Sequence, residues 1–92
     1  MTKPTAEELT SRLQTAFPEG RIQVTDDSHL HAGHAGAASG GGHYSVRLIS
    51  GEFSGLSTLA RHRLVYDSVR DWMPDRIHAL SIEARTPAES DR

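Results

Sequence analysis

Hydrophobic positions recur along the first half of the chain with two different periods, which separate a helix from two strands. Residues 5–8 suit a helix start, because Thr5 and Glu8 have the spacing of a capping box. Apolar side chains then repeat at helical spacing: Leu9, Leu13, Ala16 and Phe17. Pro18 and Gly20 end this helix, and residues 21–25 and 43–48 alternate with period two, as half-buried strands do.

The second half predicts a further helix and a third strand. The helix runs from about Ser57 or Leu59 to Trp72. At 100° per residue its apolar arc contains His62 and these hydrophobic residues: Leu59, Tyr66, Val69 and Met73, with Val65 and Trp72 at the flank. Residues 77–85 alternate again, which places His78 on the core-facing side with Leu80, Ile82 and Ala84. Phe53, in the turn before the helix, is expected to anchor into the core.

This order of elements predicts an α/β (α+β) fold: helix, strand, strand, helix, strand. Three strands form one sheet, and the helices cover one of its faces. We expect a single domain over residues 1–92, with a frayed polar tail over residues 86–92.

Residues 28–43, between the first two strands, hold four of the six histidines among Ala, Gly and Ser. The strands are expected to form an antiparallel hairpin, with residues 29–42 as a mobile loop. His29 and His31, or His31 and His34, have spacings that can chelate a metal ion. No carboxylate or thiolate lies inside this loop, so a solvated linker is an equally valid interpretation of the spacing. For His78, the alternative to a metal ligand is a partly buried imidazole bonded to a backbone carbonyl.

Composition narrows the classes of function. Ninety-two residues with 36% hydrophobic content support one thin core without a deep substrate cavity, and no spacing singles out a nucleophile and its base. We therefore expect no enzyme. The absence of cysteine excludes disulfides and an all-cysteine metal site from this chain alone. No apolar run of about 18 residues predicts a membrane span, so a cytoplasmic protein is expected.

Several motifs together resemble the BolA family over residues 6–89. They are Val24-Thr25-Asp26-Asp27-Ser28-x-x-His31, His43-Tyr44, Ile49-Ser50-x-x-Phe53-x-Gly55, Arg61-His62-Arg63-Leu64-Val65-Tyr66 and Ile77-His78-Ala79-Leu80-Ser81-Ile82. The resemblance implies a sandwich similar to the class II KH fold, which agrees with the predicted order of elements.

The resemblance also implies a partner and a cofactor. BolA-like proteins pair with monothiol glutaredoxins around a bridging two-iron two-sulfur cluster, to which the glutaredoxin and glutathione bring thiolates. Carried over by position, the imidazole ligands of this chain are His78 and His31, and His29 or His34 could replace His31. The implied function is an adaptor in iron–sulfur cluster trafficking or assembly. The isolated chain is expected to be a monomer without a cofactor.

The alternative implied by the family is a DNA-binding transcriptional regulator of stress and morphology responses. Four arginines would contact phosphates: Arg61, Arg63, Arg70 and Arg76. Against this stand the net charge of −2 and the absence of the KH Gly-x-x-Gly loop in the expected place. Arg61 and Arg63 could equally form a solvated helix face. A third interpretation is an interaction domain whose histidines are incidental.

Overall fold

The computed structural model describes residues 3–28 and 42–90, so most of the predicted loop over residues 29–42 lies outside the described residues. The elements follow the predicted order, with short additions: α1 (Ala6–Ala16), β1 (Arg21–Asp26), β2 (Gly42–Ile49), η2 (Gly51–Phe53), α3 (Thr58–Ser68), η3 (Arg70–Trp72), β3 (Ile77–Arg85) and α4 (Pro87–Ser90). Within this part of the chain, no helix has the length and apolar content needed to cross a membrane.

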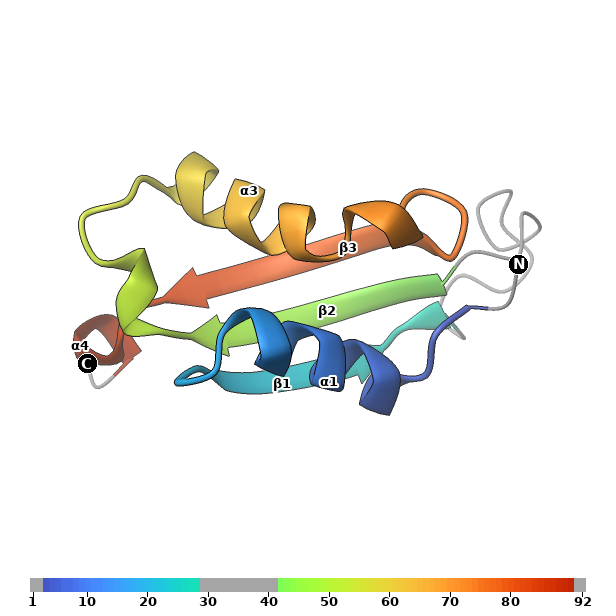
Figure 1. The fold of residues 1–92 in the computed structure, drawn as a ribbon, viewed down its shortest axis with the longest axis horizontal. Coiled ribbons are helices and arrows are strands. Elements are labelled where there is room, and N and C mark those ends of the chain that lie inside the picture. Colours follow the sequence, from blue (N-terminus) through green and yellow to red (C-terminus); the bar gives the residue numbers. More distant parts are fainter. Residues whose placement is uncertain (1–2, 29–41, 91–92) are drawn as a thin grey trace.

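The three strands form one mixed sheet in the order β1-β2-β3. β1 pairs with β2 in antiparallel register, which confirms the predicted hairpin, and β2 pairs with β3 in parallel register. α1 and α3 lie on the same side of this sheet (Figure 1). The predicted α+β architecture is therefore confirmed.

The core fills the space between the sheet and the helices. Its buried residues come from α1, β2, η2, α3 and β3 and from the residues that end α1 and α3: Leu9, Leu13, Phe17, Tyr44, Val46, Leu48, Phe53, Val65, Val69, Ile77 and Leu80. Phe53 is fully buried, as predicted, and its ring lies 5.5 Å from that of Phe17. This ring pair joins η2 to the end of α1.

The start of α1 agrees with its predicted cap. Thr5 Oγ1 accepts a hydrogen bond from the amide of Glu8 at 3.0 Å, and the Thr5 amide donates to Glu8 Oε1 at 2.8 Å. Ala16 was expected in the buried stripe but is exposed. The chain leaves the helix at Phe17 (φ −128°, ψ 75°), whose ring fills the core in place of the Ala16 methyl group.

The apolar arc predicted for the second helix is wrong in its orientation. Leu59 is 63% exposed and Tyr66 37% exposed, whereas Val65 and Val69 are fully buried. Arg61 explains the rotation: its guanidinium donates to the carbonyl oxygens of Leu56 (3.0 Å) and Ala84 (3.1 Å). These bonds turn the Arg61 side of α3 toward β3, and they leave the Leu59 side outward. His62 is half-buried instead of lying in the core.

The prediction of a frayed tail is wrong for residues 86–90. Thr86 is buried and caps α4, because its Oγ1 accepts from the Glu89 amide (3.2 Å) while the Thr86 amide donates to Glu89 Oε1 (2.9 Å). Arg61 also forms a bidentate ion pair with Glu89, with Nη1 2.6 Å from Oε1 and Nη2 3.1 Å from Oε2. The sequence carried the signal: Thr86-Pro87-Ala88-Glu89 is a capping box with proline at the first helical position.

Candidate functional site

Three strand ends meet at one end of the sheet. There β1 ends while β2 and β3 begin (Figure 1), and the register pairs Asp26 with Tyr44 and Gly42 with Ile77. Ser28 and Gly42, on either side of residues 29–41, belong to this end. Two of the described histidines, His43 and His78, each occupy the second position of a strand, β2 and β3 respectively.

His78 is exposed, so the prediction of a core-facing side chain is wrong. The pairing of β2 with β3 shifts at this point, because Gly42 faces Ile77 whereas the next residue, His43, faces Ala79. His78 is thus one extra residue on β3, a bulge that reverses the alternation. Ile77 takes the buried position, and the His78 imidazole turns to solvent.

His43 lies beside His78, a juxtaposition that sequence reasoning missed. The two ring centroids are 5.1 Å apart and the ring planes are tilted by 44°. The His43 backbone is held from the end of β1: its carbonyl accepts from the Asp27 amide at 2.7 Å, and its amide donates to Ser28 Oγ at 3.1 Å. In the sequence, His43 stands out as the fourth histidine of residues 28–43 and as part of the His43-Tyr44 motif, but neither feature places it beside His78.

The bulge is packed tightly from the core side. The Gly42 amide donates to the carbonyl of Arg76 at 3.0 Å. A Cβ atom on Gly42 would lie 2.5 Å from Cε2 of Tyr44, whose hydroxyl donates to the carbonyl of Pro4. Burial, with the nearby charge of Asp26, raises the pKa of Tyr44 to about 12. Gly42 and the Tyr44 ring are therefore closely packed beneath the bulge.

The end of β1 is fixed by polar contacts within the segment and with Lys3 and Ser45. The Ser28 amide donates to Asp26 Oδ1 at 2.9 Å, and Lys3 Nζ lies 3.4 Å from Asp26 Oδ2. Burial opposes the charge on Asp26, yet the Ser28 hydrogen bonds and the Lys3 charge outweigh it and lower its pKa. Ser45 Oγ donates to the carboxylate of Asp27. Both sides of residues 29–41 thus have defined anchors.

Only one of the predicted metal ligands lies in the part of the chain that the structure describes. His78 is described, whereas His31 and its alternatives His29 and His34 lie outside the described residues. Within residues 3–28 and 42–90, no group of three or more His, Cys, Asp or Glu side chains is arranged to hold a metal ion. The imidazoles of His43 and His78 could supply two nitrogen ligands, and other donors would have to complete a tetrahedral site.

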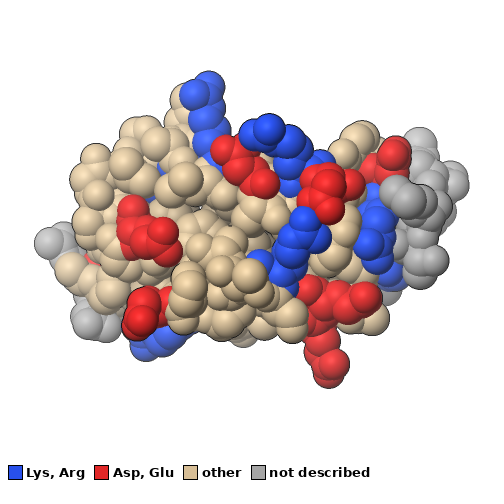
Figure 2. Space-filling view, in the orientation of Figure 1, with Lys and Arg blue, Asp and Glu red and all other residues tan. Residues whose placement is uncertain are grey.

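The four predicted phosphate contacts do not form one group of available cations. Arg61 is 13% exposed and is engaged by Glu89 and two carbonyls. Arg70 is exposed and pairs with Asp67 at 2.6 Å, and Arg76 stacks 4.8 Å from the Trp72 ring. Arg63 is exposed. On the face with the helices, Lys and Arg side chains alternate with Asp and Glu side chains (Figure 2).

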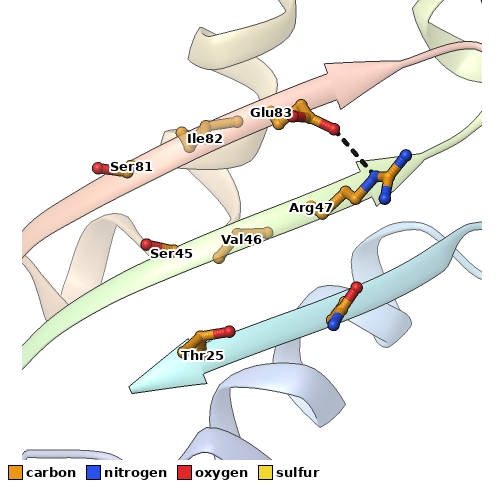
Figure 3. A pocket seen from close by; sticks show the side chains of 8 residues that line it. Thr25, Ser45, Val46, Arg47, Ser81, Ile82 and Glu83 are labelled. Atoms are coloured by element: carbon orange, nitrogen blue, oxygen red, sulfur yellow. Dashed lines mark ion pairs between the residues drawn. The ribbon is translucent and has the colours of Figure 1, made fainter. Parts of the chain in front are cut away.

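The face of the sheet without helices carries a polar hollow of about 330 Å³. Its walls come from all three strands: Gln23, Thr25, Ser45, Val46, Arg47, Ser81, Ile82 and Glu83. Figure 3 shows the ion pair across it, with Arg47 Nε 2.9 Å from Glu83 Oε2. Its hydroxyls and paired charges give it no metal-binding chemistry comparable with the histidine end.

Sequence comparisons relate this chain to a known family. Residues 13–89 match the family model described as BolA-like protein. The chain is 38% identical over 86 residues to SufE-like protein 1, chloroplastic/mitochondrial, of Arabidopsis thaliana, a match that covers 88% of this chain and 23% of that protein. It is 32% identical over 83 residues to the DNA-binding transcriptional regulator BolA of Escherichia coli (strain K12), covering 90% of this chain and 76% of the regulator.

A solved structure has the same fold. The BolA domain of SufE1 from Arabidopsis thaliana superposes with a TM-score of 0.78 at 37% identity, and the match covers 91% of this chain and 93% of that domain. The family model, the two sequence relatives and this structure agree on one assignment: the chain belongs to the BolA-like protein family.

Proposed function

We propose that this chain is an iron–sulfur adaptor that binds a monothiol glutaredoxin and gives imidazole ligands to a shared two-iron two-sulfur cluster. One observation carries the proposal: the bulge at the start of β3 turns the His78 imidazole out to solvent, at the sheet end where residues 29–41 leave and return. An exposed histidine fixed by a strand is available to a metal centre on another molecule.

The donor set supports a shared centre. The sequence has no cysteine, and the described residues offer two neighbouring imidazoles without a third ligand. A two-iron cluster needs four protein or thiol ligands. Thiolates from a glutaredoxin and from glutathione would complete such a set, so the cluster belongs to the complex and not to this chain alone.

The chain length between Ser28 and His31 supports a ligand from residues 29–41. Ser28 Oγ is bonded to the His43 amide, and His31 follows Ser28 by three residues. Three residues span at most roughly 11 Å. His31 can therefore reach the His78 end of the sheet, as can His29, and His34 has a tether twice as long.

Imidazole ligands give the cluster distinct chemistry. Replacement of thiolates by histidines raises the reduction potential of a two-iron cluster, as in Rieske centres. Binding also requires neutral imidazoles, so loading falls as pH drops through the titration range of histidine. These properties suit a protein that transfers or senses a cluster, and the role is that of an adaptor and not of an enzyme.

The test is an anaerobic titration of the chain into a cluster-loaded monothiol glutaredoxin with glutathione, followed by visible circular dichroism. Wild type should produce a new spectrum, which His78→Ala abolishes and His31→Ala weakens. His62→Ala, on α3, is the matched control and should behave as wild type. A wild-type mixture whose spectrum equals the sum of its components would exclude the adaptor role. A new spectrum indifferent to His78→Ala and His31→Ala would favour the interaction domain with incidental histidines.

DNA binding is the second candidate, because a relative with 32% identity is named a DNA-binding transcriptional regulator. Arg63 and Arg70 are the exposed arginines among the four predicted contacts, although Arg70 pairs with Asp67. Anisotropy of a labelled duplex should then show binding that weakens steeply with salt and is reduced in Arg63→Ala. Salt-independent anisotropy, or binding unchanged by Arg63→Ala, would exclude phosphate contacts by this helix face.

A further inference from the structure

The face of the sheet without helices carries more positive than negative charge. The strand register arranges its outward residues in three rows across β1, β2 and β3: Thr25, Ser45 and Ser81; Gln23, Arg47 and Glu83; Arg21, Ile49 and Arg85. These rows define the surface that we call the open face. They contain three arginines and one glutamate, whereas the whole chain has a net charge of −2.

The charge of the open face changes along the strands. Beside the first row, Ser45 donates to the carboxylate of Asp27, which brings a negative charge to the histidine end. In the third row, Arg21 and Arg85 lie on the outer strands, on either side of Ile49. Arg21 takes part in none of the ion pairs among the described residues. The positive charge is therefore concentrated at the end of the sheet near α4.

At this end, one carboxylate is shared by two guanidinium groups. Nε of Arg47 lies 2.9 Å from Oε2 of Glu83, and Nε of Arg85 lies 3.3 Å from the same oxygen. Figure 3 shows the Arg47 pair. Each guanidinium has five N–H donors, so one oxygen occupies few of them. All three side chains are about half exposed, and exposed ion pairs contribute little to stability, so a second carboxylate can bind beside Glu83.

The open face is hollowed along its length. The hollow of about 330 Å³ adjoins a second one of about 280 Å³ toward α4. The second hollow is lined by six residues: Arg21, Ile22, Gln23, Arg47, Ile49 and Ser90. The two hollows share Gln23 and Arg47, so they form one groove that follows the strands. A groove of this shape fits an extended chain.

Charge and composition indicate what the groove binds. Carboxylates at alternate positions of an extended peptide lie about 6.6–6.8 Å apart on one side, which is also the spacing of successive rows along a strand. Gln23 and the hydroxyl groups of the first row can bond peptide carbonyl and amide groups. Sheets that bind single-stranded nucleic acid present aromatic rings to the bases. No residue of the three rows is aromatic, so the observations favour an acidic peptide.

We propose that the open face is a docking surface for an extended acidic segment of a partner protein. Alternate carboxylates of this segment pair with Arg47 and with Arg21 or Arg85. None of these arginines belongs to the four predicted phosphate contacts. The inference does not rest on the proposed adaptor function, because the arginines lie along the sheet from the His78 end and bind no cluster.

Fluorescence anisotropy of a labelled peptide tests this assignment at low ionic strength. The probe alternates Glu and Ser over about ten residues, roughly 33 Å in extended form, and a peptide with Gln in place of Glu is its control. The protein variants are Arg21→Gln, Arg47→Gln and the triple variant that adds Arg85→Gln. Arg12→Gln is the charge-matched control, because Arg12 belongs to α1, which covers the opposite face of the sheet (Figure 1).

Wild type should bind the Glu peptide and not the Gln peptide, with an affinity that falls as salt is added. Arg21→Gln and Arg47→Gln should each weaken binding about two- to fivefold, the range of an exposed ion pair. The triple variant should weaken binding at least about tenfold. Arg12→Gln should bind as wild type does.

Replacement of Glu83 gives the opposite prediction. Glu83→Gln should tighten binding of the Glu peptide, because it removes the carboxylate that competes for Arg47 and Arg85. Glu7→Gln removes the same charge from an exposed residue of α1 and should leave the affinity unchanged.

Absence of wild-type binding to the Glu peptide would overturn the inference. Equal weakening in Arg12→Gln and Arg47→Gln would also overturn it, since the peptide would then respond only to net charge. An oligothymidylate of the same length that binds more tightly than the peptide, and is released by the triple variant, would reassign the open face to nucleic acid. None of these outcomes bears on the cluster titration, which tests the proposed function separately.

Discussion

Replacement of Gly42 by alanine should destabilise the fold at the base of the histidine pair. The new Cβ would lie 2.5 Å from Cε2 and 2.6 Å from Cζ of Tyr44, a buried ring whose hydroxyl is bonded to Pro4. Forcing a group into a packed core costs about 1–3 kcal/mol. Displacing the ring adds about 0.5–1.5 kcal/mol for the weakened hydrogen bond.

A smaller term opposes this loss. Gly42 is not among the positive-φ glycines of the described residues, so alanine there reduces the freedom of the unfolded chain and would by itself stabilise by about 0.4–1 kcal/mol. Together these contributions predict a decrease of roughly 0.5–4 kcal/mol in the free energy of unfolding. For a domain of this size, each kcal/mol lowers Tm by roughly 4–8 °C.

Urea unfolding followed by the fluorescence of Trp72 measures this change. Trp72 is the single tryptophan, and the centre of its ring lies 4.5 Å from the guanidinium carbon of Arg12 and 4.8 Å from that of Arg76. Gly51→Ala is the matched control, because a Cβ there meets nothing within 4 Å. It should leave stability unchanged or raise it slightly.

A double-mutant cycle with Tyr44→Leu isolates the contact. In that background the clash is relieved, so Gly42→Ala should cost less than in wild type or even stabilise the protein. Equal losses in both backgrounds would refute the assignment of the cost to the Tyr44 ring. A Gly42→Ala protein as stable as wild type would refute the reasoning as a whole.

Three further predictions follow from the described contacts. Phe53→Ala should lower the free energy of unfolding by about 3–5 kcal/mol, because it empties a fully buried ring site; urea unfolding measures it, and a loss below about 1 kcal/mol would contradict the burial. Hydrogen bonds from Arg61 and the Thr86 amide lower the pKa of Glu89 from 4.5 to about 2. Its contribution to stability is therefore present above pH 4.5 and is lost as pH falls from 4.5 to about 2. The NMR titration midpoint of its carboxyl carbon should rise toward 4.5 in Arg61→Ala, and an unchanged midpoint would argue against the ion pair. Tyr44 should ionise with a midpoint at about pH 12 in an absorbance titration, because burial raises its pKa. Its contribution to stability is therefore lost as pH rises from 10 to about 12. If the difference between the wild-type and Tyr44→Phe titrations has its midpoint near pH 10, the burial of Tyr44 is contradicted.

The order of elements could be predicted from the sequence because the hydrophobic period of each helix or strand is set by residues close together in the chain. Alternation in residues 21–25 and 43–48 defined the hairpin, and the capping box of Thr5 and Glu8 defined the start of α1. These signals depend on neighbours within a few residues, so tertiary contacts did not override them.

The orientation of individual side chains was harder to predict because it depends on distant partners. The α3 arc failed because Arg61 binds Ala84 and Glu89, more than 20 positions away, and this contact sets which side of the helix faces the sheet. The predicted orientation of His78 was wrong because a one-residue bulge in the pairing with β2 reverses the alternation of β3 at this point. A bulge is a property of two strands, and the sequence of one strand does not reveal it.

The candidate site was therefore predicted in part. The BolA resemblance assigned His78, and the structure adds that its imidazole faces solvent beside His43. His31 as a ligand stays a prediction, since it lies outside the described residues. For Arg61, a contact within the fold replaces the expected phosphate contact.

The central claim is that the outward-facing His78 holds a cluster shared with a monothiol glutaredoxin. Anaerobic native mass spectrometry of the reconstituted mixture tests it most directly, because the mass gives the protein stoichiometry together with the bound iron, sulfide and glutathione. The account predicts a one-to-one complex with two irons, two sulfides and one glutathione for wild type and for His62→Ala, and loss of the cluster-containing complex for His78→Ala. The same cluster-containing mass at equal abundance in His78→Ala would contradict it.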